Sequence, residues 1–140
     1  MFTFRRSPTK DKILWLTSPD HIAQAILIFI PLWFGIILAN KHNTFETSRS
    51  FLVMQMQMTE SQWALVSIIF AIIGIMCWAT GNRFAMIFQN ALLMGWHGMI
   101  ALCIFLANPI TTGSGTYAIL AFAATMRAVN LSLSYPAQWK

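Results

Sequence analysis

The sequence predicts an all-α, polytopic membrane protein: a four-helix transmembrane bundle with both termini cytoplasmic. Of its 140 residues, 57% are hydrophobic and 9% are charged, whereas soluble domains carry about 25% charged residues. Four apolar runs approach the ~20 residues that a helix needs to cross a bilayer. The length suits one membrane domain, residues 1–140, without a separate soluble domain.

The chain opens with a basic segment, residues 1–18, which has four basic residues against Asp11 alone. We interpret it as a cytoplasmic tail, because Lys and Arg gather on the cytoplasmic side of membranes. The tripeptide Ser18-Pro19-Asp20 is typical of a helix start, where serine caps free N–H groups and proline fits the first turn. The first predicted span is 22–39, and Pro31 should kink it.

Residues 40–60 form the predicted outer loop. Phe51, Met54 and Met58 share one face of a short amphipathic helix within it. This face either packs over the helices of its own chain or is a candidate partner surface for another protein; soft methionine side chains suit such a contact. Thr59 and Gln62 match a capping box, which opens the next span.

The second and third predicted spans, 63–79 and 84–107, are joined by Gly81-Asn82-Arg83. A turn this short makes the two helices antiparallel neighbours. The fourth predicted span, 115–133, is strongly apolar only from Tyr117. An alternative has three spans, with this last helix lying flat on the membrane.

The basic residues set the predicted orientation. With the N-terminus inside, seven basic residues lie on the inner side and two, Lys41 and Arg49, on the outer side. This distribution follows the positive-inside rule and predicts a multi-pass protein of the bacterial inner (cytoplasmic) membrane. The net charge of +5 is thereby explained by the lipid bilayer as partner, and no nucleic-acid partner is expected.

Polar residues within the third span are the candidate pore or helix-packing face. Asn90 and His97 are seven residues apart, two turns along one helix face. Gly95 and Gly98 lie nearby, and Ala91 with Gly95 forms a small-xxx-small pair that favours close helix packing. The face either packs against a neighbouring helix through hydrogen bonds or lines a water-filled path. The packing interpretation predicts that Gly95→Leu disrupts the bundle.

Arg127 is the candidate intramembrane or interfacial charge. It either snorkels to the inner surface or organises the bundle through a salt bridge to Asp20 or a polar contact with Asn90.

No pattern in the sequence indicates catalysis. The four acidic residues lie outside the spans or at their edges, and the chain has no nucleophile–base pair, phosphate-binding loop or zinc-ligand spacing. A haem needs an axial partner, and only His97 lies deep in a span, whereas His21 and His42 lie near opposite ends of the first predicted helix. We therefore expect no catalytic residues, no metal and no cofactor, with Cys77 and Cys103 as small buried residues.

Several short runs resemble small membrane proteins of tailed bacteriophages. They are Ser18-Pro19-Asp20-His21, the loop from Asn43 to Phe51, and Ala107-Asn108-Pro109 with Thr112–Tyr117. Some members of that group are described as holin-like from size and hydropathy. The resemblance implies no functional residues that could be transferred to this chain.

Two classes of function fit these observations. The first is a non-enzymatic, self-associating membrane protein with holin-like activity, which opens a membrane lesion for a muralytic enzyme during phage lysis. The second is a structural or interaction protein that docks a partner through the outer loop. A third class, a small channel, would differ from a holin in showing ion selectivity.

Overall fold

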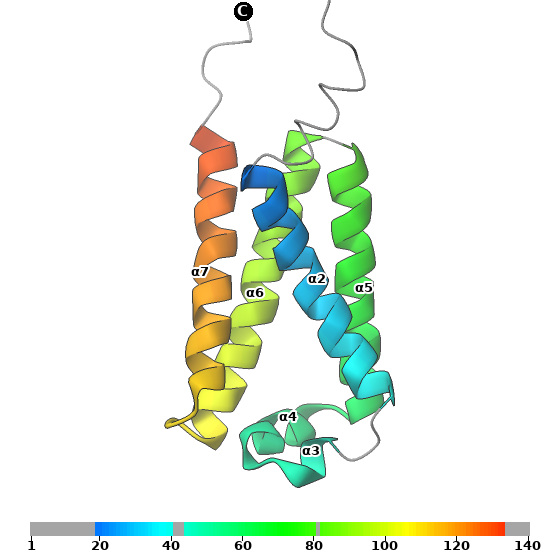
Figure 1. Cartoon of the computed structure of the whole chain (residues 1–140), viewed down its shortest axis with the longest axis vertical. Coiled ribbons are helices and arrows are strands. Elements are labelled where there is room, and N and C mark those ends of the chain that lie inside the picture. The colour runs from blue at the N-terminus through cyan, green and yellow to red at the C-terminus, as the bar shows by residue number, and fades with distance from the viewer. Residues whose placement is uncertain (1–18, 41–43, 81, 134–140) are drawn as a thin grey trace, which may run out of the picture.

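The computed structural model describes residues 19–40, 44–80 and 82–133, and within them the chain is helical without any β-strand. Four long helices, α2 (Pro19–Asn40), α5 (Glu60–Thr80), α6 (Arg83–Ala107) and α7 (Thr112–Leu133), form a bundle (Figure 1). Three short elements, α3 (Thr44–Thr47), the 3-10 turn η1 (Arg49–Phe51) and α4 (Leu52–Gln57), connect α2 to α5.

All four long helices are long and apolar enough to cross a membrane, which indicates a multi-pass membrane protein. The predicted boundaries are close to the observed ones: α2, α5 and α7 each begin three residues earlier than predicted, and α2 and α5 each end one residue later. Helix α7 begins at Thr112 and has 22 residues, about 33 Å at 1.5 Å per residue. It runs alongside α6, which favours four spans over the alternative in which it lies flat.

Local capping explains where two of the helices begin. The predicted capping box is confirmed: the Thr59 N–H donates to Gln62 Oε1 at 2.9 Å, and the Gln62 N–H donates to Thr59 Oγ1 at 3.3 Å. At the start of α6, Asn82 Oδ1 accepts hydrogen bonds from the N–H groups of Phe84 and Ala85. The expected cap at Ser18 lies outside the described residues, although α2 does begin at Pro19.

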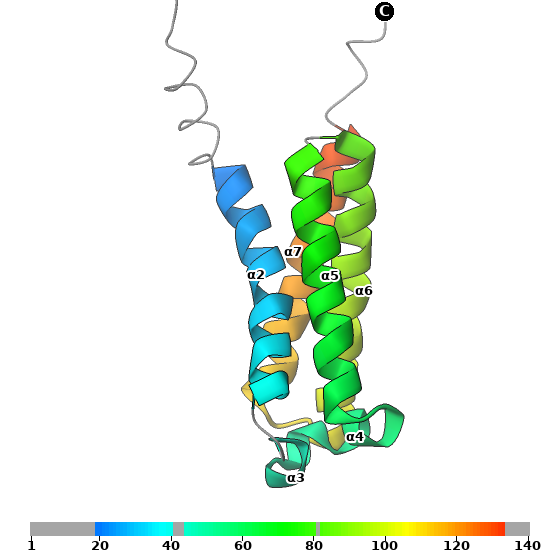
Figure 2. The same ribbon diagram turned by 90° about the vertical axis from the view of Figure 1, so that its right-hand side faces the viewer.

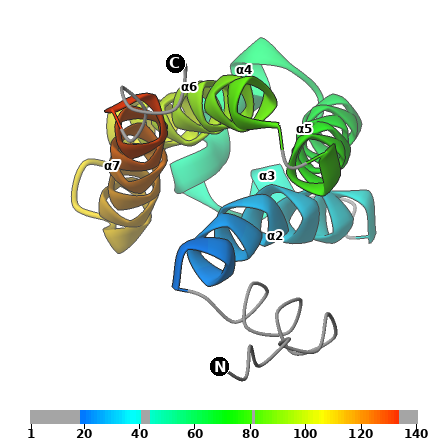
Figure 3. The ribbon, with the colours of Figure 1, turned by 90° about the horizontal axis from the view of Figure 1, so that it is seen from above.

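The bundle consists of two tightly packed helix pairs. Helix α2 packs along α5 and helix α6 packs along α7, whereas contacts between the two pairs are fewer. Viewed down the bundle, the four helices surround a common centre (Figure 3). We call the end with Pro19, the α5–α6 turn and Leu133 the turn end, and the end with α3, η1 and α4 the loop end (Figure 2).

Small residues let α2 and α5 approach closely. Gly35 faces α5 so tightly that a Cβ atom there would lie 2.7 Å from Ile68 Cγ1 and 3.0 Å from the Ala64 carbonyl oxygen. The matching face of α5 has a buried small residue at each turn: Ala64, Ser67, Ala71 and Gly74. Such small-residue faces favour helix association in lipid, because burying apolar surface between helices contributes little free energy there.

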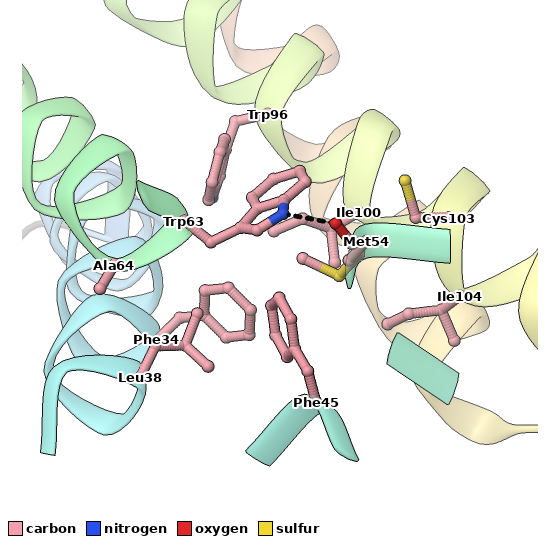
Figure 4. Close-up of a cluster of buried hydrophobic side chains, with 10 residues drawn as sticks. All are labelled: Phe34, Leu38, Phe45, Met54, Trp63, Ala64, Trp96, Ile100, Cys103 and Ile104. Atoms are coloured by element: carbon pink, nitrogen blue, oxygen red, sulfur yellow. Dashed lines mark hydrogen bonds between the residues drawn. The ribbon is translucent and has the colours of Figure 1, made fainter. Parts of the chain in front are cut away.

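An apolar cluster closes the loop end of the bundle (Figure 4). It combines Phe34 and Leu38 of α2, Phe45 of α3, Met54 of α4, Trp63 and Ala64 of α5, and Trp96, Ile100, Cys103 and Ile104 of α6. Trp63 is fully buried, and its indole Nε1–H donates to the Met54 carbonyl oxygen at 2.9 Å. This bond ties the short helix α4 to the long helix α5.

We expect Trp63→Phe to lower the free energy of unfolding by ~1–3 kcal/mol, because the Met54 carbonyl keeps only the Met58 N–H as a donor and the smaller ring leaves a void. Unfolding in mixed detergent micelles, followed by circular dichroism, measures the loss. Trp33→Phe is the matched control, since Trp33 is 54% exposed. Equal stability of the two variants would contradict the role assigned to Trp63.

Candidate functional site

Polar side chains gather where the two helix pairs meet, and we call this group the polar seam. Its members are Gln24 of α2, Gln89, Asn90 and His97 of α6, and Arg127 of α7. The four uncharged members are at most 1% exposed, and Arg127 is half-buried. Intramembrane polar groups are costly in hydrocarbon and mark the first place to look for function.

Gln24 is the centre of the polar seam because it joins three helices. Its Oε1 accepts hydrogen bonds from Asn90 Nδ2 at 3.0 Å and from Arg127 Nε at 2.9 Å. Asn90 Nδ2 also donates to the Met86 carbonyl at 2.8 Å. The sequence analysis missed Gln24, although it is the only amide or charged side chain in the predicted span 22–39.

Several buried atoms of the polar seam have no hydrogen-bond partner among the described residues. They are Gln24 Nε2, both side-chain polar atoms of Gln89, Asn90 Oδ1 and both ring nitrogens of His97; Trp96 Nε1, on the same helix, is a further one. A buried polar group without a partner costs about 1–3 kcal/mol. These atoms can therefore bind water or another polar partner at this interface.

The predicted face of the third span is buried inside the bundle. Asn90 and His97 are both 0% exposed, and the His97 ring lies 6.0 Å from the Tyr117 ring of α7. Gly98 faces α7 too, because a Cβ atom there would lie 4.0 Å from Ala121 Cβ. Asn90 bonds across a helix interface as the packing interpretation predicts.

Gly95 does not pack against another helix of this chain. A Cβ atom at Gly95 would meet nothing within 4 Å, and Ala91 and Gly95 both lie on the exposed side of α6. Within this chain the close approach occurs instead at Gly35 on α2. The small-xxx-small pair was a reasonable signal, but spacing does not say which side of a helix faces its neighbour.

Arg127 forms a hydrogen bond that links α7 to α2. It reaches Gln24, and through Gln24 it is linked to Asn90. A second arginine supports the same end of the bundle: Arg83 of α6 donates through Nε and an Nη nitrogen to the carbonyls of Leu131 and Ser132, both at 2.6 Å. Cations near the last turn of a helix satisfy its free carbonyl groups. The side chain of Asp20 lies outside the described residues.

The candidate partner surface in the outer loop is turned inward. Met54 is 0% exposed, while Phe51 and Met58 are partly buried against the same apolar cluster. An exposed docking face on these three residues is therefore wrong, and the segment packs over its own helices. Met56 is 79% exposed. It lies two positions after Met54, and because successive positions on a helix lie about 100° apart, it points away from this cluster.

The polar seam consists of side chains that can form hydrogen bonds. No group of three His, Cys, Asp or Glu residues lies close enough to hold a metal ion in this part of the chain. Cys77 and Cys103 are free thiols. The polar seam offers amides, an imidazole and a guanidinium, which can bind water or line a hydrated path.

Comparisons with known proteins find no match: no family model fits the chain, and no curated protein or solved structure is significantly similar to it. The resemblance to phage membrane proteins therefore stays a prediction.

Proposed function

We propose that this protein is a non-enzymatic, self-associating protein of the bacterial inner membrane that permeabilises it in a holin-like manner. In this proposal both termini, and hence the turn end, are cytoplasmic. Permeabilisation requires the α2–α5 pair to separate from the α6–α7 pair. The observation that carries the proposal is the polar seam, with its orphaned polar atoms at the interface between the pairs.

Separation of the pairs would change the solvent of the polar seam. The orphaned atoms of Gln24, Gln89, Asn90 and His97 would gain water as a partner, which offsets part of the cost of opening. The exposed polar face could not rest against lipid, because hydrocarbon penalises it. Several copies that turn these faces toward one another would enclose water instead. Self-association and permeabilisation are thus linked by one physical requirement.

The test is membrane potential in bacteria after induced expression, with and without an endolysin that lacks an export signal. We expect abrupt depolarisation, and lysis only when the endolysin is present. The double variant Gln24→Leu/Asn90→Leu should insert normally and leave the membrane potential intact, because its polar seam has fewer groups that can form hydrogen bonds with water. Thr125→Val is the matched control, since Thr125 bonds only to the Ala121 carbonyl within its own helix, and it should depolarise like the wild type.

Two outcomes would contradict the proposal. A steady potential with the wild-type protein confirmed in the inner membrane would exclude permeabilisation. Full depolarisation by the double leucine variant would show that the polar seam does not line the lesion.

A further inference from the structure

The segment Thr44–Gln57 belongs to one helix pair by chain connection and contacts the other by packing. It joins α2 to α5, yet both η1 and α4 lie against α6. Figure 4 shows Phe45 and Met54 reaching into the cluster that also contains Trp96, Ile100 and Ile104 of α6. Phe45 is 4% exposed and Met54 is 0% exposed, so both side chains are buried in this cluster.

Because this segment is connected to one helix pair and packs against the other, we propose that Thr44–Gln57 is a latch that holds the two helix pairs together at the loop end. The inference rests on the proposed function, because it names the contact that opposes opening of the polar seam. The latch is the regulatory device, and its release precedes separation of the pairs.

Chain connectivity explains why this position controls opening. At the turn end, α5 and α6 are joined between Thr80 and Arg83, so the two pairs pivot about this connection, and Gln24 and Asn90 of the polar seam, which lie near it, part only after the loop end has opened. At the loop end no such short connection joins the pairs: the chain from Ala107 to Thr112 links α6 to α7, which lie within one pair. The pairs can therefore swing apart at the loop end unless packing holds them, and the latch adds its contacts to the direct packing of Trp96 of α6 against Trp63 and Phe34 of the other pair.

The contacts of the latch suit a reversible device. On its own side it is held by two hydrogen bonds to α5: Trp63 Nε1–H donates to the Met54 carbonyl at 2.9 Å, and the Thr44 N–H donates to Glu60 Oε1 at 3.0 Å. Toward α6 its contacts are apolar packing and one weak polar contact, Cys103 Sγ to Gln57 Oε1 at 3.8 Å. Apolar packing contacts have no fixed bond geometry to break, so the latch can leave α6 while staying attached to α5.

The contact between Gln57 and Cys103 offers a direct test. In a Cys77→Ala background, Gln57→Cys brings a thiol from the latch to the native thiol of α6, where oxidation forms a disulfide if the Cβ atoms approach to about 4 Å. A short bifunctional thiol reagent serves where they do not. Failure of both cross-links would contradict the placement of the latch.

The first readout is release of a trapped dye from liposomes that contain the purified protein. We expect the cross-linked protein to lose dye release and to regain it fully on reduction. Gln57→Ser is the matched control, because it makes a similar change in size and polarity but cannot be cross-linked, and the oxidant should leave its release unchanged.

The second readout does not depend on permeabilisation. Leu93 packs in the interface between the pairs with Leu27, Ile28 and Ala124 and is 1% exposed, so a cysteine there reacts with N-ethylmaleimide only when the pairs separate. After the latch is cross-linked in the Leu93→Cys variant, alkylation of Cys at this position should slow severalfold. An unchanged alkylation rate would contradict the proposal that Thr44–Gln57 is a latch, whatever the result of the dye-release measurement. Slower alkylation without dye release from any form would support the latch and refute permeabilisation.

Discussion

Gly35→Leu is expected to separate α2 from α5 and to lower the free energy of unfolding by at least ~2 kcal/mol, at the upper part of the range for overpacked cores. Even the first added carbon would lie 2.7 Å from Ile68 Cγ1 and 3.0 Å from the Ala64 carbonyl oxygen. The isoleucine side chain can turn, but the backbone of α5 cannot retreat without losing the rest of the interface. Unfolding in mixed detergent micelles, followed by circular dichroism, measures the effect.

Gly95→Leu is the matched control for this prediction. It makes the same chemical change in another long helix, at a position where a Cβ atom meets nothing within 4 Å, so the stability of the monomer should stay within ~0.5 kcal/mol of the wild type. A large loss at Gly95 with little loss at Gly35 would mean that the helix faces are assigned the wrong way round.

Gln24→Ala is the second change with a large expected effect. It removes the oxygen that accepts hydrogen bonds from Asn90 and Arg127 and leaves a cavity at a fully buried position. We expect a loss of ~2–3 kcal/mol in the free energy of unfolding, from the unpaired partners together with the cavity.

The double variant Gln24→Leu/Asn90→Leu should lose less stability than Gln24→Ala. Replacing both amides by apolar groups of similar size removes their hydrogen bond together with the orphaned Gln24 Nε2 and Asn90 Oδ1 and leaves no cavity, although Arg127 still loses its bond to Gln24. A double-mutant cycle over Gln24 and Asn90 should give a coupling of ~0.5–1.7 kcal/mol, as for other hydrogen bonds between membrane helices. A coupling near zero would show that the two amides do not act together.

Stability and activity together separate a structural seam from a functional one. If the double leucine variant is stable and inserted yet leaves the membrane potential intact, the polar groups are present for permeabilisation rather than for folding. If it is destabilised instead, the polar seam is a structural element of the bundle, and its loss of activity would carry no information about a lesion.

The number and type of the long helices could be predicted from the sequence. Four apolar runs, the capping box at Thr59 and Gln62 and the short α5–α6 turn are local signals, and each was confirmed at or near its predicted position. Such features depend on hydrophobicity and on backbone groups within a few residues of one another. The same local reasoning placed Asn90 and His97 on one helix face.

Only the tertiary structure decided which faces meet. Gly95 and Gly35 have the same side chain, yet one faces away from the bundle and the other lies against α5. Helical spacing correctly groups Phe51 of η1, Met54 of α4 and Met58, which follows α4, but an apolar face looks the same whether it contacts a partner protein or packs into its own bundle. Gln24 became central only because α6 and α7 bring Asn90 and Arg127 to it, 66 and 103 residues along the chain. Hydrophobic patterning cannot distinguish the lipid-facing from the helix-facing surfaces of these helices, because both surfaces are apolar. Which surfaces face another helix is determined by close packing of small residues and by hydrogen bonds between polar side chains.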